Sequence, residues 1–132
     1  MLIKRLSDIR SSERNVKHEG WESSRLLLAS DGMGFSFHIT TLESGRSWTF
    51  HYQHHVEAVY VISGSGTIED LSAGEKHALQ PGTLYALDKH DRHTLTAATD
   101  LVTACVFNPP VTGTEVHDAS GAYRPAAAAV AS

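Results

Sequence analysis

Cysteine and long apolar runs are both scarce in this chain of 132 residues. The single cysteine, Cys105, lies in an apolar run, so we expect a buried free thiol and no internal disulfide bond. The absence of disulfides fits a reducing, cytoplasmic setting. No apolar run approaches the roughly 18 residues of a membrane-spanning helix, and the charged residues 4 and 5 do not fit a signal peptide. The sequence therefore predicts no membrane partner.

Clustered positive charge is scarce as well. The chain has 11 Lys and Arg against 15 Asp and Glu, which gives a formal net charge of −4. Binding to nucleic-acid phosphates requires concentrated Lys and Arg, so the sequence predicts no nucleic-acid partner. Histidine, in contrast, is abundant, with nine residues. Imidazole binds metals and carries protons near neutral pH, which indicates a site that uses one or both of these properties.

The length fits a single domain, which can bury roughly 70% of its unfolded surface. We place that domain at residues 1–120. Residues 121–132 are rich in alanine, contain Pro125 and show no periodic apolar face, so we expect a flexible C-terminal tail there. One short helix is expected at residues 7–14, with Ser7 as its cap.

Alternation of apolar and polar residues predicts an all-β fold. In the strand at 35–40, Phe35, Phe37 and Ile39 are expected to face the core, and the polar residues between them to face away from it. Many short strands in a small chain favour a closed sandwich or a small barrel. The strands that we expect are 25–29, 35–40, 47–52, 57–63, 67–71, 75–79, 83–87, 93–98 and 101–107.

A spaced set of glycine, histidine and acidic residues runs through the middle of the chain and consists of Gly45, His51, Gln53, Glu57 and Gly64. This spacing resembles the first metal-binding motif of the cupin superfamily, in which a His-x-His pair and a later Glu point into a small β-barrel and hold a metal. Here Gln53 replaces the second His of the pair, and the later cupin motif, Pro-x-Gly-x-x-His, appears as Pro-Gly-Thr-Leu-Tyr at 81–85. Two of the four usual ligand positions are therefore altered.

Three longer strings extend the pattern: Leu-Tyr-Ala-Leu-Asp-Lys-His-Asp-Arg-His at 84–93, His-His-Val-Glu-Ala-Val-Tyr at 54–60 and Gly-Phe-Ser-Phe-His-Ile-Thr at 34–40. They resemble the ectoine synthase family, a specialised group of cupins, and the resemblance runs from Gly20 to His117. It implies a cupin-type small β-barrel, or jelly roll, with one or two short helices, and a homodimer formed by pairing of β surfaces. It also implies an iron(II) ion held by Glu57, Tyr85 and His93, although other divalent metals suit the same ligands.

The expected local geometry agrees with this ligand set. If residues 88–90 form a tight connection, Tyr85 lies directly opposite His93 in an antiparallel pair, with Cβ atoms ~5 Å apart. Both side chains then reach one ion, and a dication allows the phenol of Tyr85 to lose its proton near neutral pH. A buried Glu57 without a partner or an ion would be costly.

The family closes N-γ-acetyl-L-2,4-diaminobutyrate to the cyclic amidine ectoine with loss of water, a carbon–oxygen hydro-lyase reaction that supplies a compatible solute in osmotic stress. Arg25 suits the substrate carboxylate, because guanidinium matches that group in two hydrogen bonds. The resemblance does not decide which residue is the general base. It places Trp21, Arg25, His38, Thr40, His55 and Phe107 around the substrate, and its candidates for amine contact and proton transfer are Tyr52, Glu115 and His117.

Position 38 is commonly Asn in the family, so His38 introduces a titratable ring, and we expect an altered pH profile of the reaction. His51 is expected to lie near the site without binding the metal. Two other functions fit the same fold. One is an iron-dependent cupin dioxygenase or lyase that acts on a small polar acid, and the other is a non-catalytic module that captures a small solute. The histidines expected on the surface are His18, His54, His77 and His90.

Overall fold

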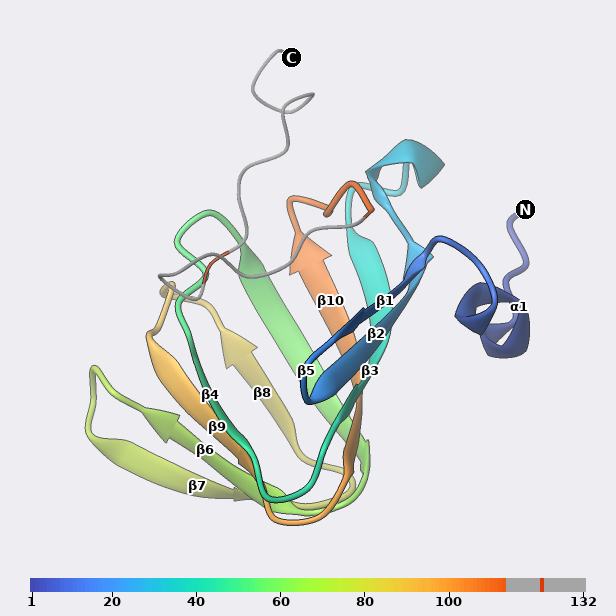
Figure 1. Cartoon of the computed structure of the whole chain (residues 1–132). Helices are drawn as coiled ribbons and strands as arrows, with labels where there is room; N and C mark the ends of the chain where they lie inside the picture. Colours follow the sequence, from blue (N-terminus) through green and yellow to red (C-terminus); the bar gives the residue numbers. More distant parts are fainter. Residues whose placement is uncertain (114–121, 123–132) are drawn as a thin grey trace.

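Two antiparallel β-sheets pack face to face in the computed structural model, which describes residues 1–113 and 122 (Figure 1). One sheet has six strands in the order β1-β2-β3-β10-β5-β8, and the other has four in the order β4-β9-β6-β7. This architecture confirms the predicted all-β fold with one or two short helices. The elements are α1 (Leu6–Arg10), β1 (Asn15–His18), β2 (Trp21–Leu27), the 3₁₀ helix η1 (Ala29–Asp31), β3 (Ser36–Leu42), β4 (Ser47–Phe50), β5 (Val56–Ser63), β6 (Gly66–Asp70), β7 (Glu75–Leu79), β8 (Leu84–Leu87), β9 (His93–Ala97) and β10 (Leu101–Asn108).

Each predicted strand overlaps an observed one, but the N-terminal strands were predicted incompletely. Strand β1 was not predicted, and β2 begins at Trp21 rather than at residue 25. The buried residues of β2 include Ser23 and Arg25. Because these are polar side chains, the apolar alternation that marks a half-buried strand is missing from the sequence there.

The predicted helix at 7–14 is also shorter than expected. It ends at Arg10, and Arg5 rather than Ser7 occupies its N-cap position, without a side-chain hydrogen bond. The hydroxyl of Ser11 donates to the carbonyl oxygen of Ser7 at 3.2 Å, and that of Ser12 donates to Ile9 at 2.7 Å. Serine hydroxyls that bond to nearby backbone in this way compete with helix continuation.

Strand β3 has the opposite orientation from the one predicted. Ser36 and His38 are buried, whereas Phe37 and Ile39 are only half-buried. The strand lies between β2 and β10 in the middle of the six-stranded sheet, so one of its faces turns toward the other sheet. That inner face carries the polar residues, because the space between the sheets is not filled by apolar side chains alone.

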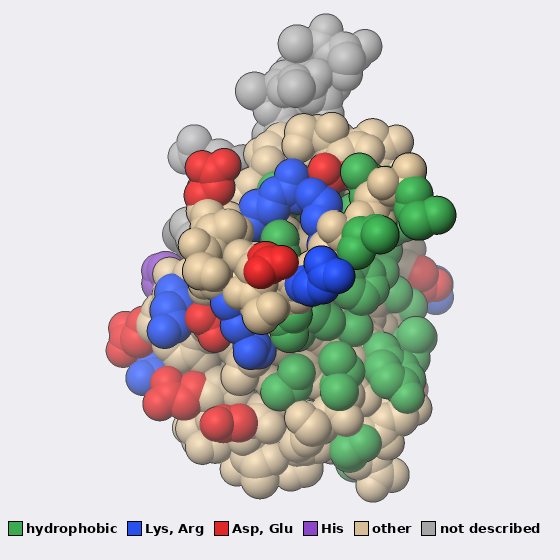
Figure 2. Space-filling view, turned by 90° about the vertical axis from the view of Figure 1, so that its right-hand side faces the viewer, with side chains coloured by type: hydrophobic (Ala, Val, Ile, Leu, Met, Phe, Trp, Pro, Cys, Tyr) green, Lys and Arg blue, Asp and Glu red, His purple; other side chains and the backbone are tan. Residues whose placement is uncertain are grey.

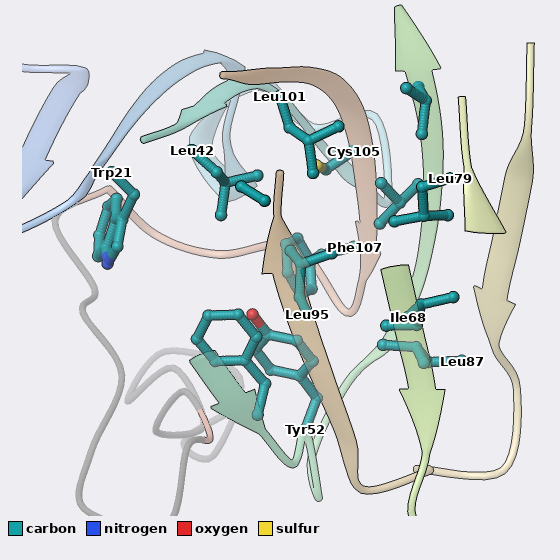
Figure 3. Close-up of a cluster of buried hydrophobic side chains, with 14 of the residues drawn as sticks. Trp21, Leu42, Tyr52, Ile68, Leu79, Leu87, Leu95, Leu101, Cys105 and Phe107 are labelled. Atoms are coloured by element: carbon teal, nitrogen blue, oxygen red, sulfur yellow. The ribbon is translucent and has the colours of Figure 1, made fainter. Parts of the chain in front are cut away.

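The apolar core lies between the two sheets, where side chains from both sheets meet (Figure 3). Leu42, Val61 and Phe107 come from the six-stranded sheet, and Leu95 and Ala97 come from the four-stranded sheet. The core is interrupted on its inner faces by buried polar residues, which mark the candidate site. In the part of the chain that the structure describes, no helix is long and apolar enough to cross a membrane.

Candidate active site

A cavity opens between the two sheets, and predicted site residues from both sheets line it. The six-stranded sheet contributes Glu57 from β5 and Tyr85 from β8. The four-stranded sheet contributes His93 from β9. The further predicted residues on the cavity wall are Trp21, Thr40 and Tyr52.

The predicted metal ligands Glu57, Tyr85 and His93 come together, but not by the predicted route. Tyr85 is not paired with His93, because β8 pairs with β5 while β9 pairs with β4 and β6 in the other sheet. Their rings instead face each other across the cavity, with centroids 6.4 Å apart. Glu57 pairs with Leu87, and Tyr85 pairs with Val59, so Glu57 and Tyr85 are diagonal neighbours on one sheet face.

Burial makes this group of side chains costly to ionise without a cation. Glu57 is only 8% exposed, and burial raises the pKa of its carboxyl to about 8, an effect that a hydrogen bond with Cys105 reduces. Burial of the phenol, together with the neighbouring Glu57, raises the pKa of Tyr85 well above its usual value. A bound cation would reverse these shifts, since an adjacent positive charge favours the ionised forms.

His93 is oriented as a metal-binding histidine would be. Its Nδ1 lies 2.9 Å from the carbonyl oxygen of Asp91, which leaves Nε2 for a ligand. Metal-ligating histidines commonly donate their other ring N–H to a backbone carbonyl in this manner. Among residues 1–113 and 122, no three His, Cys, Asp or Glu side chains form a metal-binding group, so a site here depends on the phenol oxygen of Tyr85. The donor set of one carboxylate, one phenol and one imidazole fits a divalent cation.

A second buried polar group lies beside the cavity. Arg25 is completely buried, and its Nη1 donates to the carbonyl oxygen of Gly113 at 2.7 Å. Its Nε donates to Ser23 Oγ at 3.3 Å, and the same hydroxyl lies 3.5 Å from Nδ1 of His38. The His38 ring contacts Phe107, with centroids 5.2 Å apart. The interior beside the cavity thus combines a buried guanidinium with polar and aromatic side chains.

One protein family matches nearly the whole chain. Its model, described as ectoine synthase, matches residues 1–127. The chain belongs to the ectoine synthase family. The L-ectoine synthase of Sphingopyxis alaskensis is 63% identical over 123 residues, which cover 93% of this chain and 90% of that protein. The L-ectoine synthase of Mycobacteroides abscessus is 51% identical over 130 residues, which cover 98% of this chain and 99% of that protein.

Solved structures agree with this assignment. The crystal structure of ectoine synthase from P. lautus matches with a TM-score of 0.83 and 44% identity over 86% of this chain and 81% of that chain. A cupin domain of a transcriptional regulator from Enterobacter cloacae matches with a TM-score of 0.58 and 17% identity over 69% of this chain and 98% of that chain. At this identity the match shows the shared fold alone. The cupin prediction is therefore confirmed. Ectoine synthases are lyases, so the chain belongs to a family of enzymes.

The predicted substrate residues of this ectoine synthase family member divide into two groups. Trp21 and Thr40 line the cavity, as predicted. Arg25, His38, His55 and Phe107 are buried next to it, where the His38 and His55 rings both contact Phe107. Glu115 and His117 lie outside the described residues, so their predicted roles stay predictions. The predicted tail also lies outside them, apart from Ala122, which is buried.

The pKa of His38 bears on the pH profile that the sequence predicts. Burial lowers its pKa well below the usual value, and the neighbouring Arg25 and His55 lower it further. The lowered pKa favours the neutral ring, which argues against the altered pH profile expected from the sequence. Among the described residues, Nε2 of His38 has no hydrogen-bond partner.

Three polar residues of the cavity wall were missed as site residues. Ser23, Thr103 and Cys105 line the cavity, and Thr103 Oγ1 lies 3.3 Å from Cys105 Sγ. Burial, followed by the neighbouring Glu57, raises the pKa of the Cys105 thiol. The predicted buried thiol is confirmed, but it also faces the site. The alternation of β10 could have revealed this, because residues 103 and 105 share a face with Phe107.

The remaining histidines lie mostly where predicted. His18, His54 and His77 are exposed, and His18 stacks on Trp21 with ring centroids 5.6 Å apart. His51 is half-buried and does not line the cavity. His90 is exposed as predicted, but one of its ring nitrogens is bonded to the backbone of the site.

Proposed function

We propose that the chain catalyses the cyclising dehydration of N-γ-acetyl-L-2,4-diaminobutyrate to ectoine. The new bond joins the α-amine nitrogen to the carbon of the acetamido carbonyl, and the carbonyl oxygen leaves as water. The observation that carries the proposal is the convergence of Glu57, Tyr85 and His93 on one cavity in a member of the ectoine synthase family. Production of this compatible solute in the cytoplasm, in response to osmotic stress, is part of the same proposal.

The reaction needs an activated amide, because an amide carbonyl is a poor electrophile. Glu57, Tyr85 and His93 would hold a divalent cation, for which we propose iron(II), with other divalent metals as possible substitutes. Such an ion, when bound, supplies Lewis acidity that polarises the amide carbonyl. The buried carboxyl and phenol support this role, since both have raised pKa values when no cation is near.

The substrate must be bound in a folded, ring-closing shape, which removes much of the entropic barrier. We assign the substrate carboxylate to Arg25, the only charged residue among the completely buried side chains of the described part of the chain. Trp21 and Phe107 exclude water. Contacts to the polar groups of the substrate are assigned to Thr40, His38 and His55.

The amine must lose a proton before it attacks, and water must be released afterwards. Tyr52 is one candidate for this proton transfer, because it lies on the cavity wall and its ring centroid is 5.9 Å from that of His93. Glu115 and His117 complete the candidates for amine contact and proton transfer.

A homodimer is the second part of the proposal. The outer face of β5 and β8 carries Tyr60, Ile62 and Leu84, which are 46%, 46% and 60% exposed. Tyr60 and Leu84 are paired across the two strands, so they form a continuous apolar surface. Figure 2 shows hydrophobic side chains gathered on the right of the face that it draws, whereas most of the charged side chains lie toward the left. Burial of such a surface against a second copy would be favourable.

An anaerobic assay tests the catalytic proposal. Iron(II)-loaded protein is incubated without oxygen with N-γ-acetyl-L-2,4-diaminobutyrate, and ectoine is quantified by NMR. We expect many turnovers per protein molecule, because cyclisation consumes no oxygen. Activity only in the presence of oxygen would favour a dioxygenase, and binding without turnover would favour a solute-capturing module.

A further inference from the structure

His90 has an unusual backbone conformation and an unusual pair of contacts. Its φ of 54° is the only positive φ of a non-glycine residue in the described part of the chain. Such conformations cost energy and persist when other interactions fix them. Nδ1 of His90 lies 2.8 Å from the carbonyl oxygen of Tyr52 and 3.1 Å from that of His55. The ring thus bonds to the backbone on both sides of the bend at 53–54, which lies in a different loop from His90.

The two loops concerned both cross from one sheet to the other. Residues 51–55 connect β4 to β5, and residues 88–92 connect β8 to β9. At one end of these loops Phe50 pairs with His93, and at the other Glu57 pairs with Leu87. The loops therefore begin and end beside each other, and the His90 ring bonds one to the other next to the cavity.

We propose that His90 is a positioning residue, which fixes the loop at 51–55 so that Tyr52 and His55 keep their places in the site. The Tyr52 and His55 rings contact Phe107 from different directions, with centroids 5.1 Å and 5.9 Å away. The backbone of each is held by the same nitrogen of His90. This inference rests on the proposed cyclase function for its effect on rate, but the contact itself does not depend on that function.

The chemistry of the contact fixes the protonation of the ring. Both partners are carbonyl oxygens, which only accept hydrogen bonds, so Nδ1 of His90 must carry the hydrogen. A neutral ring protonated on Nδ1 and a charged ring both meet this requirement. The interaction therefore constrains Nδ1 and not the other ring nitrogen.

Substitutions can separate the hydrogen bond from the backbone strain. In His90→Asn, the amide nitrogen can occupy the place of Nδ1 and donate, and Asn tolerates a positive φ. His90→Asp has nearly the same shape and φ tolerance, but offers only acceptor oxygens to the two carbonyls. His90→Gly keeps the backbone conformation and removes the donor. His54→Ala is the matched control, because it removes an exposed imidazole from the loop at 51–55.

Hydrogen exchange of the amides at 51–55 and the turnover rate are then measured for each variant. We expect faster exchange and a kcat lower by about tenfold in His90→Asp and His90→Gly, with KM changed by less than about twofold. His90→Asn and the His54→Ala control should stay within about twofold of the parent in kcat. Should His90→Asp fail to fold, His90→Gly carries the same comparison. Parent-like exchange and kcat in His90→Gly would overturn the proposal.

NMR of the ring nitrogens tests the contact without any substrate. We expect a protonated Nδ1 for His90 in the parent protein at neutral pH, whereas a neutral ring protonated only on Nε2 would overturn the inference. If the parent protein does not cyclise the substrate, the proposed function fails. The NMR and hydrogen-exchange results still decide whether His90 holds the loop.

Discussion

The inner and outer faces of the six-stranded sheet each depart in part from the usual distribution, because polar side chains are buried on the inner face and apolar ones are exposed on the outer face. On the inner face, Arg25, Ser36 and His38 are at most 1% exposed. On the outer face, Ile62 and Leu84 are 46% and 60% exposed. The inner face lines the cavity of the candidate site, and its buried polar groups offset part of their desolvation by bonding to one another and to backbone. The outer face has apolar area that the fold of one chain does not bury.

The largest effect is expected from the ligands on the inner faces. Glu57→Gln, Tyr85→Phe and His93→Asn should each lower kcat/KM by about 10³-fold or more, because each removes a ligand that the proposed ion needs. The metal-free Glu57→Gln protein should melt no lower than the parent, since it no longer buries a carboxyl. Turnover, iron content and melting temperature are measured together. Unchanged iron content and turnover in all three variants would contradict the ligand assignment.

A smaller effect is expected from Arg25→Lys on the same inner surface. Lysine keeps the positive charge but lacks the planar pair of donors, so recognition of the carboxylate should weaken. We expect kcat/KM to fall by about 10²-fold, mainly through a higher KM. Steady-state kinetics with the substrate and with its decarboxylated analogue check the assignment. An equal loss for both compounds would show that Arg25 does not recognise the carboxylate.

The outer face is tested by Ile62→Lys, which places a charge in the exposed apolar surface. We expect the proposed dimer to dissociate, so that the mass measured by light scattering falls to that of one chain. Leu71→Lys is the matched control, because Leu71 is an exposed apolar residue, 38% exposed, at the end of β6 in the other sheet. Its mass should equal that of the parent. A monomeric parent protein would instead show that no second copy covers this surface.

The ion pair between Arg14 and Asp31 lies outside both faces of the six-stranded sheet. Its removal should change the free energy of unfolding and leave the turnover rate unchanged. Arg14 Nη1 lies 2.7 Å from Asp31 Oδ2, and the Asp31 side chain is 10% exposed. The pKa of Asp31 is lowered from 3.8 to about 2, with the hydrogen bond to Arg14 as the largest cause and the Leu28 backbone N–H and the charges of Arg14 and Lys4 adding to it. Asp31→Asn should therefore lower the free energy of unfolding by about 1–2 kcal/mol at neutral pH.

The stabilisation by the ion pair should depend on pH. Because the folded-state pKa of Asp31 lies below its unfolded value, the stabilisation is present above pH 3.8 and disappears as the pH falls toward about 2. Denaturant unfolding of the parent and of Asp31→Asn across this range measures the difference. A difference that persists unchanged at the lowest pH would contradict the ion pair as its cause.

The smallest effect is expected for His38→Asn. Because burial lowers the pKa of His38 and so favours its neutral form, exchanging its ring for an amide should leave the shape of the pH–rate profile unchanged. We expect kcat to change by less than about threefold. A shift of the acidic limb of the profile would show that His38 titrates during turnover.

The sequence predicted strands well where one side chain in two is apolar, as in β5 and β10, but it predicted β2 only in part. The inner face of β2 carries Ser23 and Arg25, which alternation of hydrophobicity does not detect. In β3, alternation was detected but was assigned to the wrong face. Periodicity separates two faces, and it does not say which of them turns inward.

By itself, the sequence determined the all-β class, the family and the residue types available for chemistry, because these depend on local alternation and on motifs that are contiguous in the chain. Only the tertiary structure decided how Tyr85 reaches His93, since their strands belong to different sheets and meet across the cavity. It also decided that burial lowers the pKa of His38 and that His90 bonds to the loop at 51–55. Both depend on burial and on contacts between segments distant in sequence, which no local pattern records.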